Sequence, residues 1–489
     1  MKRISINPIT RLEGHGKIDI FLDEEGNVAN AYFQVPELRG FEQFCIGRQA
    51  EDMPSITSRI FGVCPEAHHL ASVKALDQLF AAEPPPAAKK IRELLYMAFF
   101  VTDHTTHFYA LGGPDFIVGP DAPPAGRNIL GVVRTVGLEV GKAVIECRAR
   151  NHRVIQTLGG RGIHPTAGLP GGWSKSVSAP ERAEIEEAAR RNVDFALFSL
   201  GVFEKAVWGN PVYREMLESD VYCHRTYSMG TVDLSNRLNL YDGQIRVVDP
   251  DGVEFARFPA SEYLEHIAEH VEPWTYLKFP FLKKAGWKGF EEGAASGVYT
   301  ATPLARMNAS SGMATPRAQC EFEKFYAAFG GRKPVHHRLA THWARLIELL
   351  YAAERMLLLA TDPELTSPDV RAPVGRISGS GVGSVEAPRG TLIHHYEADE
   401  KGLLRRVNLI AGTTNNHAAI AMSIAKAAKC LIRAGRVVEE GLLNRIEMAF
   451  RLYDPCLSCA THSLPGSMPL EVRIRDHVGV AVRTLRREG

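Results

Sequence analysis

The sequence predicts a mainly α-helical protein with small β regions at its periphery, a fold of the α+β class. Three observations favour this class. Apolar and polar residues alternate over 3–36, apolar residues recur every three or four positions in 41–208, 321–361 and 413–450, and residues 215–320 are rich in glycine, proline and β-branched residues. Together they favour one large helical unit that carries β insertions.

The first expected element is a β-hairpin. The alternation over 3–36 breaks at DEEGN (Asp23 to Asn27), and turn residues between two alternating runs are typical of a hairpin or small sheet. The helical pattern that follows includes the segments KKIRELLYMAFFVTDHTTHFYAL and APERAEIEEAARRNVDFALFSLGVFEKAV. Residues 215–320, with GQIRVVDPDGVEFARF, are expected to form short strands and loops. A glycine-rich break, GRISGSGVGSVEAPRG (Gly375 to Gly390), separates the last two helical regions.

Charge and hydropathy exclude two classes of partner. The 489 residues include 57 Lys and Arg against 56 Asp and Glu, so no basic footprint for nucleic acid exists. No stretch of about 20 apolar residues is present, which predicts no membrane span. The start of the chain has a polar run where a signal peptide needs an apolar one, so no export signal is expected.

The cysteines point to a metal site. In a long chain without an export signal they are expected to be thiols or metal ligands, not disulfides. Cys456 and Cys459 in DPCLSCATH have the CxxC spacing that turns two thiolates toward one centre, and soft thiolates suit Zn, Fe or Ni. Cys64 in RIFGVCPEAHH is a third candidate, with burial in the core as its alternative. For His68 and His69 beside it, packing or helix capping is the alternative. The remaining cysteines lack a partner at such spacing and are expected in the core: Cys45, Cys147, Cys223, Cys320 and Cys430.

These two segments resemble the cysteine motifs of the [NiFe] hydrogenase large subunit, RxCGxCxxxH and DPCxxCxxH. The resemblance extends end to end, because further family-like segments occur in family order: RLEGHGKI (Arg11 to Ile18), RGFE (Arg39 to Glu42), DHTTHFY (Asp103 to Tyr109), EAPRGTLIHH (Glu386 to His395) and TTNNH (Thr413 to His417). The residues of the motifs are most similar to those of the soluble, cytoplasmic members that work with heterodisulfide reductase or nucleotide-reducing partners.

The resemblance implies a Ni–Fe centre whose iron carries CO and cyanide. Cys64 and Cys459 match the ligands that bridge the two metals, and Cys456 matches a terminal nickel ligand. Phe61 stands where the family has the second terminal cysteine. A phenyl ring has no lone pair for nickel, so this position departs from the family pattern.

The resemblance also implies roles for residues around the metals. Arg389 matches a guanidinium over the open face of the metal pair, where a fixed cation polarises H2 or acts as a base. Asp103 and Asp454 match the carboxylates that orient this arginine. Glu13 matches the carboxyl that relays protons from Cys456.

A single unit spanning residues 1–489 is expected from the resemblance, with a central helical bundle and small antiparallel sheets. Glu42 and His462 match ligands of a separate Mg or Fe site, which oxygen and imidazole donors suit. The expected parts of the unit are an N-terminal β region (1–40), a helical core with β insertions (41–462) and a C-terminal extension (463–489) that is cleaved in the family.

Two alternative functions follow. The first is that of a hydrogenase large subunit that catalyses H2 → 2 H+ + 2 e− or its reverse. Its electrons would pass to an iron–sulfur small subunit, because this chain lacks enough grouped cysteines to hold clusters itself. The second, which follows from Phe61, is a hydrogenase-like subunit without nickel. Such a subunit would have a structural or electron-relay role in a larger redox complex.

Overall fold

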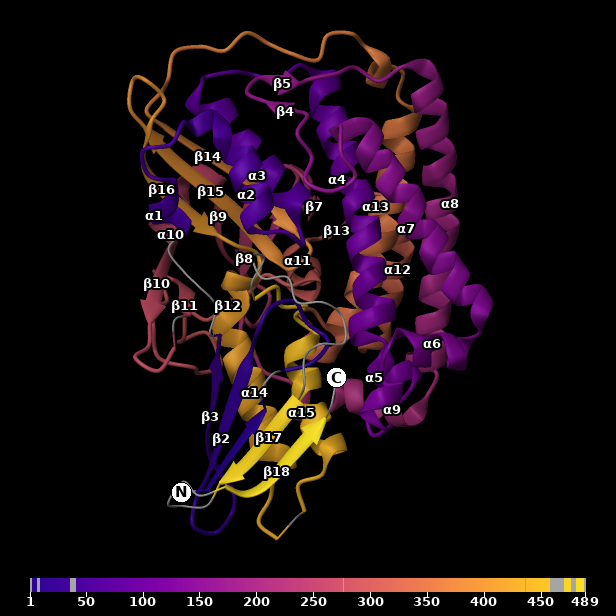
Figure 1. Ribbon diagram of the computed structural model, residues 1–489, viewed down its shortest axis with the longest axis vertical. Helices are drawn as coiled ribbons and strands as arrows, with labels where there is room; N and C mark the ends of the chain where they lie inside the picture. The colour runs from indigo at the N-terminus through magenta and orange to yellow at the C-terminus, as the bar shows by residue number, and fades with distance from the viewer. Residues whose placement is uncertain are drawn as a thin grey trace.

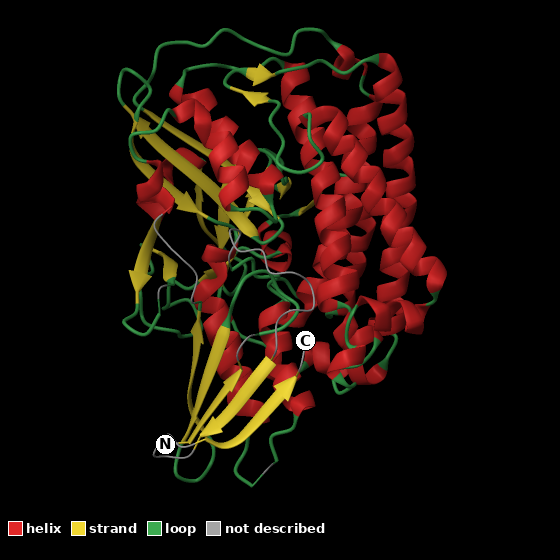
Figure 2. Cartoon of the chain, in the orientation of Figure 1, coloured by secondary structure: helices red, strands yellow, loops and turns green. Residues whose placement is uncertain are grey.

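Long helices gather on one side of the molecule and most of the sheets on the other in the computed structural model (Figure 1, Figure 2). The structure describes residues 2–6, 9–35, 41–275, 277–435, 437–457, 470–475 and 481–487. The predicted fold class, mainly helical with small β regions, is confirmed. Within the described residues, no helix combines the length and the apolar composition needed to cross a bilayer.

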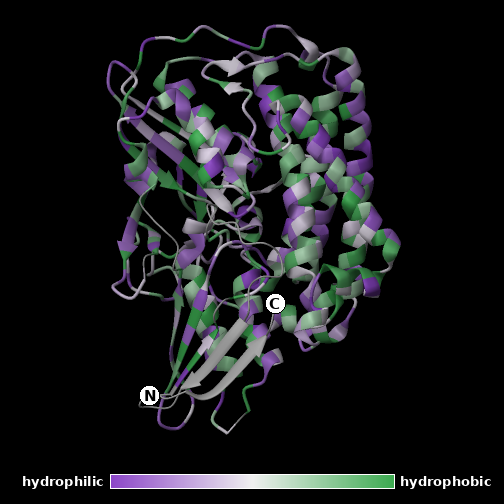
Figure 3. Cartoon of the chain, viewed as in Figure 1, coloured by the Kyte–Doolittle hydropathy of each residue, from purple (hydrophilic) through white to green (hydrophobic). Residues whose placement is uncertain are grey.

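The helical side is a bundle of long helices. Its members are α4 (Pro86–Thr106), α7 (Leu138–Gly159), α8 (Ala179–Phe203) and α13 (Thr341–Thr361). Helix α13 packs against both α4 and α8, and α7 packs against α4. Apolar and polar residues mix along each of these helices (Figure 3). Because α4 and α13 are buried along most of their length, their polar side chains also lie inside the protein.

The remaining helices are shorter and connect the bundle to the sheets. Helix α3 packs on the strands β14 (Ser380–Ala387) and β15 (Gly390–Ala398), and α14 packs on α15 and on the strand β3 (Val28–Gln34). The bounds of these helices are α1 (Phe41–Cys45), α2 (Met53–Ile60), α3 (Pro65–Leu79), α5 (Pro114–Ile117), α6 (Ile129–Val136), α9 (Pro211–Glu218), α10 (Tyr263–His266), α11 (Pro303–Ala309), α12 (Pro316–Ala328), α14 (His417–Leu431) and α15 (Glu440–Arg451).

Both ends of the chain contribute to one antiparallel sheet, in the order β18-β17-β1-β2-β3. The predicted hairpin is β2 and β3, with Lys17 opposite Gln34, and the amide of Asn27 donates to the Asp23 side chain in its turn. Strand β17 pairs with β1. The bounds are β1 (Lys2–Ile6), β2 (Lys17–Leu22), β3 (Val28–Gln34), β17 (Leu470–Arg475) and β18 (Ala481–Arg487).

Residues 215–320 form mostly short strands and loops, as the sequence predicts, but they also include the short helices α10 and α11 and the start of α12. The largest sheet here has the order β13-β7-β6-β8-β9, with β12 also paired to β6, and β10 pairs with β11. The bounds are β6 (Tyr227–Val232), β7 (Arg237–Leu238), β8 (Gln244–Val248), β9 (Glu254–Phe258), β10 (Ile267–Val271), β11 (Lys278–Leu282), β12 (Tyr299–Thr300) and β13 (Gly312–Met313). A small pair lies earlier in the chain, β4 (Gly168–Leu169) and β5 (Gly172–Trp173).

A three-stranded antiparallel sheet is the element that the sequence analysis missed. It consists of β14 (Ser380–Ala387), β15 (Gly390–Ala398) and β16 (Leu404–Ile410). Strand β14 lies inside the glycine-rich segment that was expected to be a break. Its glycines allow α3 to pack directly on the strand, because a Cβ at Gly381 would lie 2.2 Å from the Ala75 carbonyl oxygen. The turn between β14 and β15 is only two residues long, Pro388 and Arg389.

Candidate metal centre

The β14–β15 turn carries Arg389 into the interior. The guanidinium bridges two carboxylates, with Nη1 3.0 Å from Asp103 Oδ2 and Nη2 3.1 Å from Asp454 Oδ2. Asp103 comes from α4, and Asp454 follows α15. All three residues are buried. Because the planar guanidinium has its donors in a fixed geometry, bonds to two separate carboxylates hold it in one orientation.

The segment after α15 lies against the N-terminal region of the chain. The Cys456 thiol is 3.2 Å from Glu13 Oε2, and the Leu457 amide donates to the Glu13 carbonyl oxygen over 2.9 Å. The Cys456 amide donates to the Thr413 hydroxyl over 3.1 Å. Residues that are 443 positions apart in sequence are therefore held together by both backbone and side-chain bonds.

One cysteine from each motif, Cys64 and Cys456, lies near this arginine. Cys64 is buried at the start of α3. Burial alone would lower the pKa of Arg389, but Asp103 and Asp454, followed by the thiolates of Cys456 and Cys64, raise it well above its ordinary value. Both thiols thus lie within electrostatic reach of one guanidinium, which stays charged.

A cavity of about 200 Å³ adjoins these groups. Glu13, Asp103, Arg389 and Asp454 contribute charged groups to its lining. The apolar part of the lining includes Val63, Phe99, Leu111, Ile155 and Ile163. The site therefore combines oriented charges with a substantial apolar enclosure, as small-molecule sites commonly do.

Glu66 is a residue of this site that the sequence analysis missed. It lies on α3, two positions after Cys64, and lines the same cavity. Burial raises the pKa of Glu66 to about 8, with its own backbone amide opposing the shift and Cys64 and Asp103 adding to it. The signal in the sequence was its place inside RIFGVCPEAHH, next to a candidate ligand.

Phe61 ends α2, on the loop that leads to Cys64. Its ring stacks on the His68 ring, with centroids 3.9 Å apart and planes at 15°, and it meets Phe41 edge-on. The His68 ring also makes a polar contact, because its Nδ1 lies 3.0 Å from His394 Nε2. Phe61 is thus held by aromatic packing and offers no atom that could bind a metal.

Three predicted metal ligands remain: Cys459, His462 and Glu42. Cys459 and His462 lie outside the described residues, so their predicted roles as ligands remain predictions. Glu42 lies on α1, near Cys45, where burial raises the pKa of the Cys45 thiol to about 11 and Glu42 contributes to the shift.

The other cysteines follow the sequence expectation in part. Cys45 and Cys147 are buried, as predicted. Cys223 and Cys430 are only partly buried, and Cys320 is exposed on α12, so the core prediction is wrong for Cys320. Its position at the surface is explained by helical spacing, because α12 buries a different face, with Phe322 and Phe325.

The described donors, two thiols beside a fixed cation, fit a thiolate-held metal group. Cys64 and Cys456 supply soft sulfur, which suits nickel and iron. Asp103 Oδ1 and Arg389 Nε are buried without a hydrogen-bond partner among the described residues, so one acceptor and one donor remain for a group bound at the site. The loop position that would supply a further thiolate holds Phe61.

Comparisons with known proteins identify the family of this chain. The family model described as nickel-dependent hydrogenase matches residues 39–124, and one described as HoxL-like matches residues 3–38. The chain is 49% identical over 486 residues to an F420-non-reducing hydrogenase iron-sulfur subunit of Archaeoglobus profundus, and the match covers 99% of this chain and 100% of the relative. It is 37% identical to NAD-reducing hydrogenase HoxS subunit beta of Cupriavidus necator, over 98% of both chains.

Solved structures show the same relationship. The crystal structure of an NAD+-reducing [NiFe]-hydrogenase in the H2-reduced state superposes with a TM-score of 0.86 at 36% identity, covering 94% of this chain and all of that one. A [NiFeSe] hydrogenase of Desulfovibrio vulgaris Hildenborough shares the fold, with a TM-score of 0.71 at 23% identity. The chain belongs to the nickel-dependent hydrogenase family, as a large subunit of the [NiFe] type.

Proposed function

We propose that the site around Arg389 oxidises H2, or reduces protons in the reverse direction, with a Ni–Fe centre held by the cysteines of the two motifs. The observation that carries this proposal is the guanidinium fixed between Asp103 and Asp454 beside the thiols of Cys64 and Cys456. When bound, the metal pair supplies Lewis acidity and accepts electrons. The chain supplies the fixed charge above it and the proton path.

Proton removal is assigned to Cys456 and Glu13. Oxidation of H2 releases two protons and two electrons, and a base within hydrogen-bond reach must take the first proton. The Cys456 sulfur is 3.2 Å from Glu13 Oε2, so a proton taken by the thiolate has a carboxylate acceptor in direct contact. Arg389 stays protonated, because two carboxylates bind it, and it serves as a fixed electrostatic group instead of a base.

Electrons leave to an iron–sulfur partner, since the relatives are components of multi-subunit hydrogenases. The face where the cavity approaches the surface suits such a partner. Val63 and Ile163 line the cavity and are still 38% and 57% exposed, although both are large apolar residues. A partner that covers them would remove apolar surface from water and bring its nearest cluster close to the metals.

Phe61 changes the nickel ligands in this proposal. The relatives support the hydrogenase function over the nickel-free alternative, and three thiolates remain for the centre if Cys459 contributes as the motif implies. We expect a weaker nickel affinity than four thiolates would give, because soft sulfur ligands contribute most of the binding. Phe61→Cys should then raise the nickel content of protein that is produced with limiting nickel.

Three finer parts of the proposal rest on the resemblance. Glu42 and His462 would bind Mg or Fe at a separate site. The complex would work in the cytoplasm. Its electron acceptor would be a heterodisulfide reductase-like or nucleotide-reducing partner, and the NAD-reducing relative supports the second of these.

The test is a metal and activity measurement on the purified heteromeric complex. We expect nickel and iron to copurify and H2 to reduce a viologen dye. Cys64→Ser should lose both metals and the activity, whereas the matched control Cys147→Ser, at a buried cysteine of the bundle, should keep them. A complex that contains iron alone or no metal, and that does not react with H2, would support the nickel-free alternative.

A further inference from the structure

The hairpin tip that carries Arg389 lies inside the protein, which is unusual for a two-residue turn. A turn normally exposes its carbonyl groups to water, and a buried carbonyl without a partner costs free energy. Pro388 and Arg389 sit between α4, α11 and α13, away from solvent. Every carbonyl of this tip therefore needs a donor from the surrounding elements.

Side chains from different elements supply these donors. Each of the four consecutive carbonyl oxygens from Glu386 to Arg389 accepts a side-chain hydrogen bond. The Glu386 carbonyl accepts from Tyr96 Oη at 2.6 Å, and the Ala387 carbonyl accepts from Arg306 Nη1 at 2.8 Å. The Pro388 carbonyl accepts from Arg345 Nη1 at 3.3 Å, and the Arg389 carbonyl accepts from Asn416 Nδ2 at 2.6 Å. The backbone on both sides of the Arg389 side chain is thus fixed from several directions.

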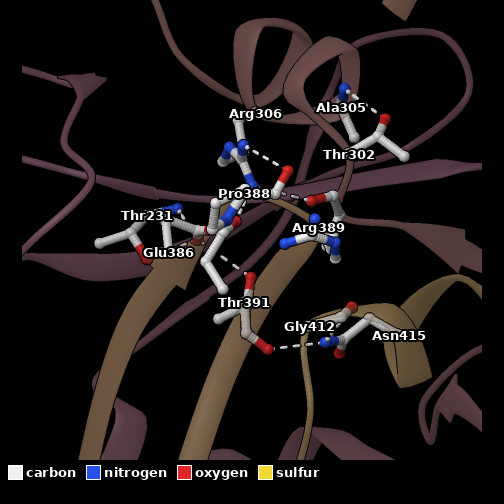
Figure 4. Close-up of polar contacts among 12 residues, drawn as sticks. Thr231, Thr302, Ala305, Arg306, Glu386, Pro388, Arg389, Thr391, Gly412 and Asn415 are labelled. Atoms are coloured by element: carbon white, nitrogen blue, oxygen red, sulfur yellow. Dashed lines mark hydrogen bonds and ion pairs between the residues drawn. The ribbon is translucent and has the colours of Figure 1, made fainter. Parts of the chain in front are cut away.

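Arg306 is the central donor of this group. Figure 4 shows its guanidinium beside Pro388, opposite Arg389 and close to Glu386. Nη1 also lies 3.4 Å from Glu386 Oε2, whose other oxygen accepts from the Thr231 amide and hydroxyl at 2.7 Å. Arg306 comes from α11, whose first turn is capped by the Thr302 hydroxyl.

Glu348 of α13 orients Arg306. Their two parallel bonds are 2.7 Å, from Nε to Oε1, and 2.6 Å, from Nη2 to Oε2, and both side chains are completely buried. Burial would raise the pKa of Glu348, but Arg306 lowers it to about 2, so the pair is ionised. This bidentate geometry leaves Arg306 Nη1 aimed at the Ala387 carbonyl.

The pair also reaches the carboxylates that hold Arg389. His104, next to Asp103 in α4, is 3.1 Å from Glu348 Oε2 through Nε2. Arg345, one turn before Glu348 in α13, lies 3.3 Å from Asp454 Oδ2. This buried group of side chains therefore contacts the Ala387 and Pro388 carbonyls just before Arg389, the residue next to Asp103 and, through Arg345, Asp454 itself.

We infer that Arg306, oriented by Glu348, is a positioning residue that fixes the tip of the β14–β15 hairpin so that Arg389 is aimed at the reacting centre. The inference rests on the proposed function only for its catalytic consequence. A buried ion pair is a poor source of stability, since an apolar pair of similar volume often serves as well. The donors that Arg306 directs at the turn give the pair a geometric role instead.

The test compares variants of two similar ion pairs on α13. Arg306→Lys and Glu348→Gln break the bidentate pair at the hairpin. Arg355→Lys, the control, breaks the bidentate Arg355–Glu93 pair, which is partly exposed and joins α13 to α4 away from the hairpin. The measurements on the purified complex are nickel and iron content, kcat and KM for H2-dependent dye reduction, and a crystal structure of each variant.

We expect Arg306→Lys and Glu348→Gln to lower kcat per metal centre by roughly 10- to 100-fold, the size of effect that a misplacement of about 1 Å produces. KM for the dye and the metal content should stay unchanged, and the crystal structures should show Arg389 displaced from Asp103 and Asp454. Arg355→Lys should keep kcat within about twofold. A purely structural role would lower yield and Tm without this loss of kcat per metal centre.

Unchanged kcat in Arg306→Lys, or a loss of kcat with Arg389 in its original place, would overturn the inference. If these variants do not fold, the double variant Arg306→Met with Glu348→Met removes the same donors together with the carboxylate that orients them. If the wild-type complex itself fails to react with H2, the proposed function fails, and the position of Arg389 in the variant crystal structures still decides the inference.

Discussion

Replacement of Glu13 by Gln separates proton transfer from every other role of this residue. The amide has nearly the size of the carboxyl and can still accept a hydrogen bond from the Cys456 thiol, which lies 3.2 Å from Glu13 Oε2. It cannot take up the proton and pass it on. The backbone bond that holds Glu13 to Leu457 does not involve the side chain and should persist.

The magnitude follows from the contact. A positioned acid–base group typically contributes 10²- to 10⁴-fold to rate, so we expect kcat for H2-dependent dye reduction to fall by at least about 100-fold. This loss corresponds to about 2.7 kcal/mol in activation free energy. Nickel and iron contents should stay at wild-type levels, because Glu13 is not among the expected metal ligands.

A matched carboxyl controls for the loss of a buried charge. Glu354 is buried, accepts bonds from the amides of Arg317 and Ala318 over 3.1 and 2.9 Å, and does not line the cavity. Glu354→Gln should leave kcat within about twofold. A fully metallated Glu13→Gln complex with wild-type kcat would refute the assignment of the proton path to Glu13.

Three further predictions concern the guanidinium, the docking face and the response to acid. Arg389→Lys keeps the charge but cannot bond to both Asp103 and Asp454 in one fixed geometry, so kcat should fall about 10-fold or more, because one charge-assisted bond contributes roughly 1.5–3 kcal/mol. Full kcat with intact metal content would speak against the guanidinium as a fixed electrostatic group. Ile163→Glu places a charge on the apolar face beside the cavity and should release the iron–sulfur partner in size-exclusion chromatography, whereas Leu234→Glu, at a position 98% exposed, should not. A stable Ile163→Glu complex would exclude this face as the docking site of the partner. Burial lowers the pKa of His342 from 6.5 to about 3, so the unfolded chain binds more protons than the folded one between these pH values, and the free energy of unfolding falls by about 1.4 kcal/mol per pH unit below 6.5. In His342→Phe, Tm should therefore drop less steeply between pH 7 and pH 5 than in the wild type, and equal slopes would refute the assignment.

The local parts of this fold could be predicted from the sequence because they depend on local patterns. The alternation on both sides of Asp23 to Asn27 specifies the β2–β3 hairpin, and three- and four-residue spacing specifies the bundle helices. The strand β14 could not be recognised in this way. Glycine weakens a strand intrinsically, and here Gly381 and Gly383 serve the close approach of α3, which is a contact between distant segments.

The same distinction applies to the site. Motif spacing selected Cys456 as a candidate ligand, whereas Cys64, Arg389 and the carboxylates around them were assigned roles by the family resemblance. Arg306 and Glu348 have no motif, and their importance lies in side chains from α11 and α13 that meet only in the folded protein. Such buried pairs are visible only from the hydrogen bonds that they make.

The central claim is that thiolates from both ends of the chain hold a Ni–Fe pair beneath Arg389. Anomalous X-ray diffraction at the nickel and iron absorption edges, on crystals of the purified complex, tests it most directly. We predict a nickel peak and an iron peak within bonding distance of the sulfurs of Cys64 and Cys456. Crystals without a transition-metal peak at these sulfurs, or with metal bound only elsewhere, would contradict the claim.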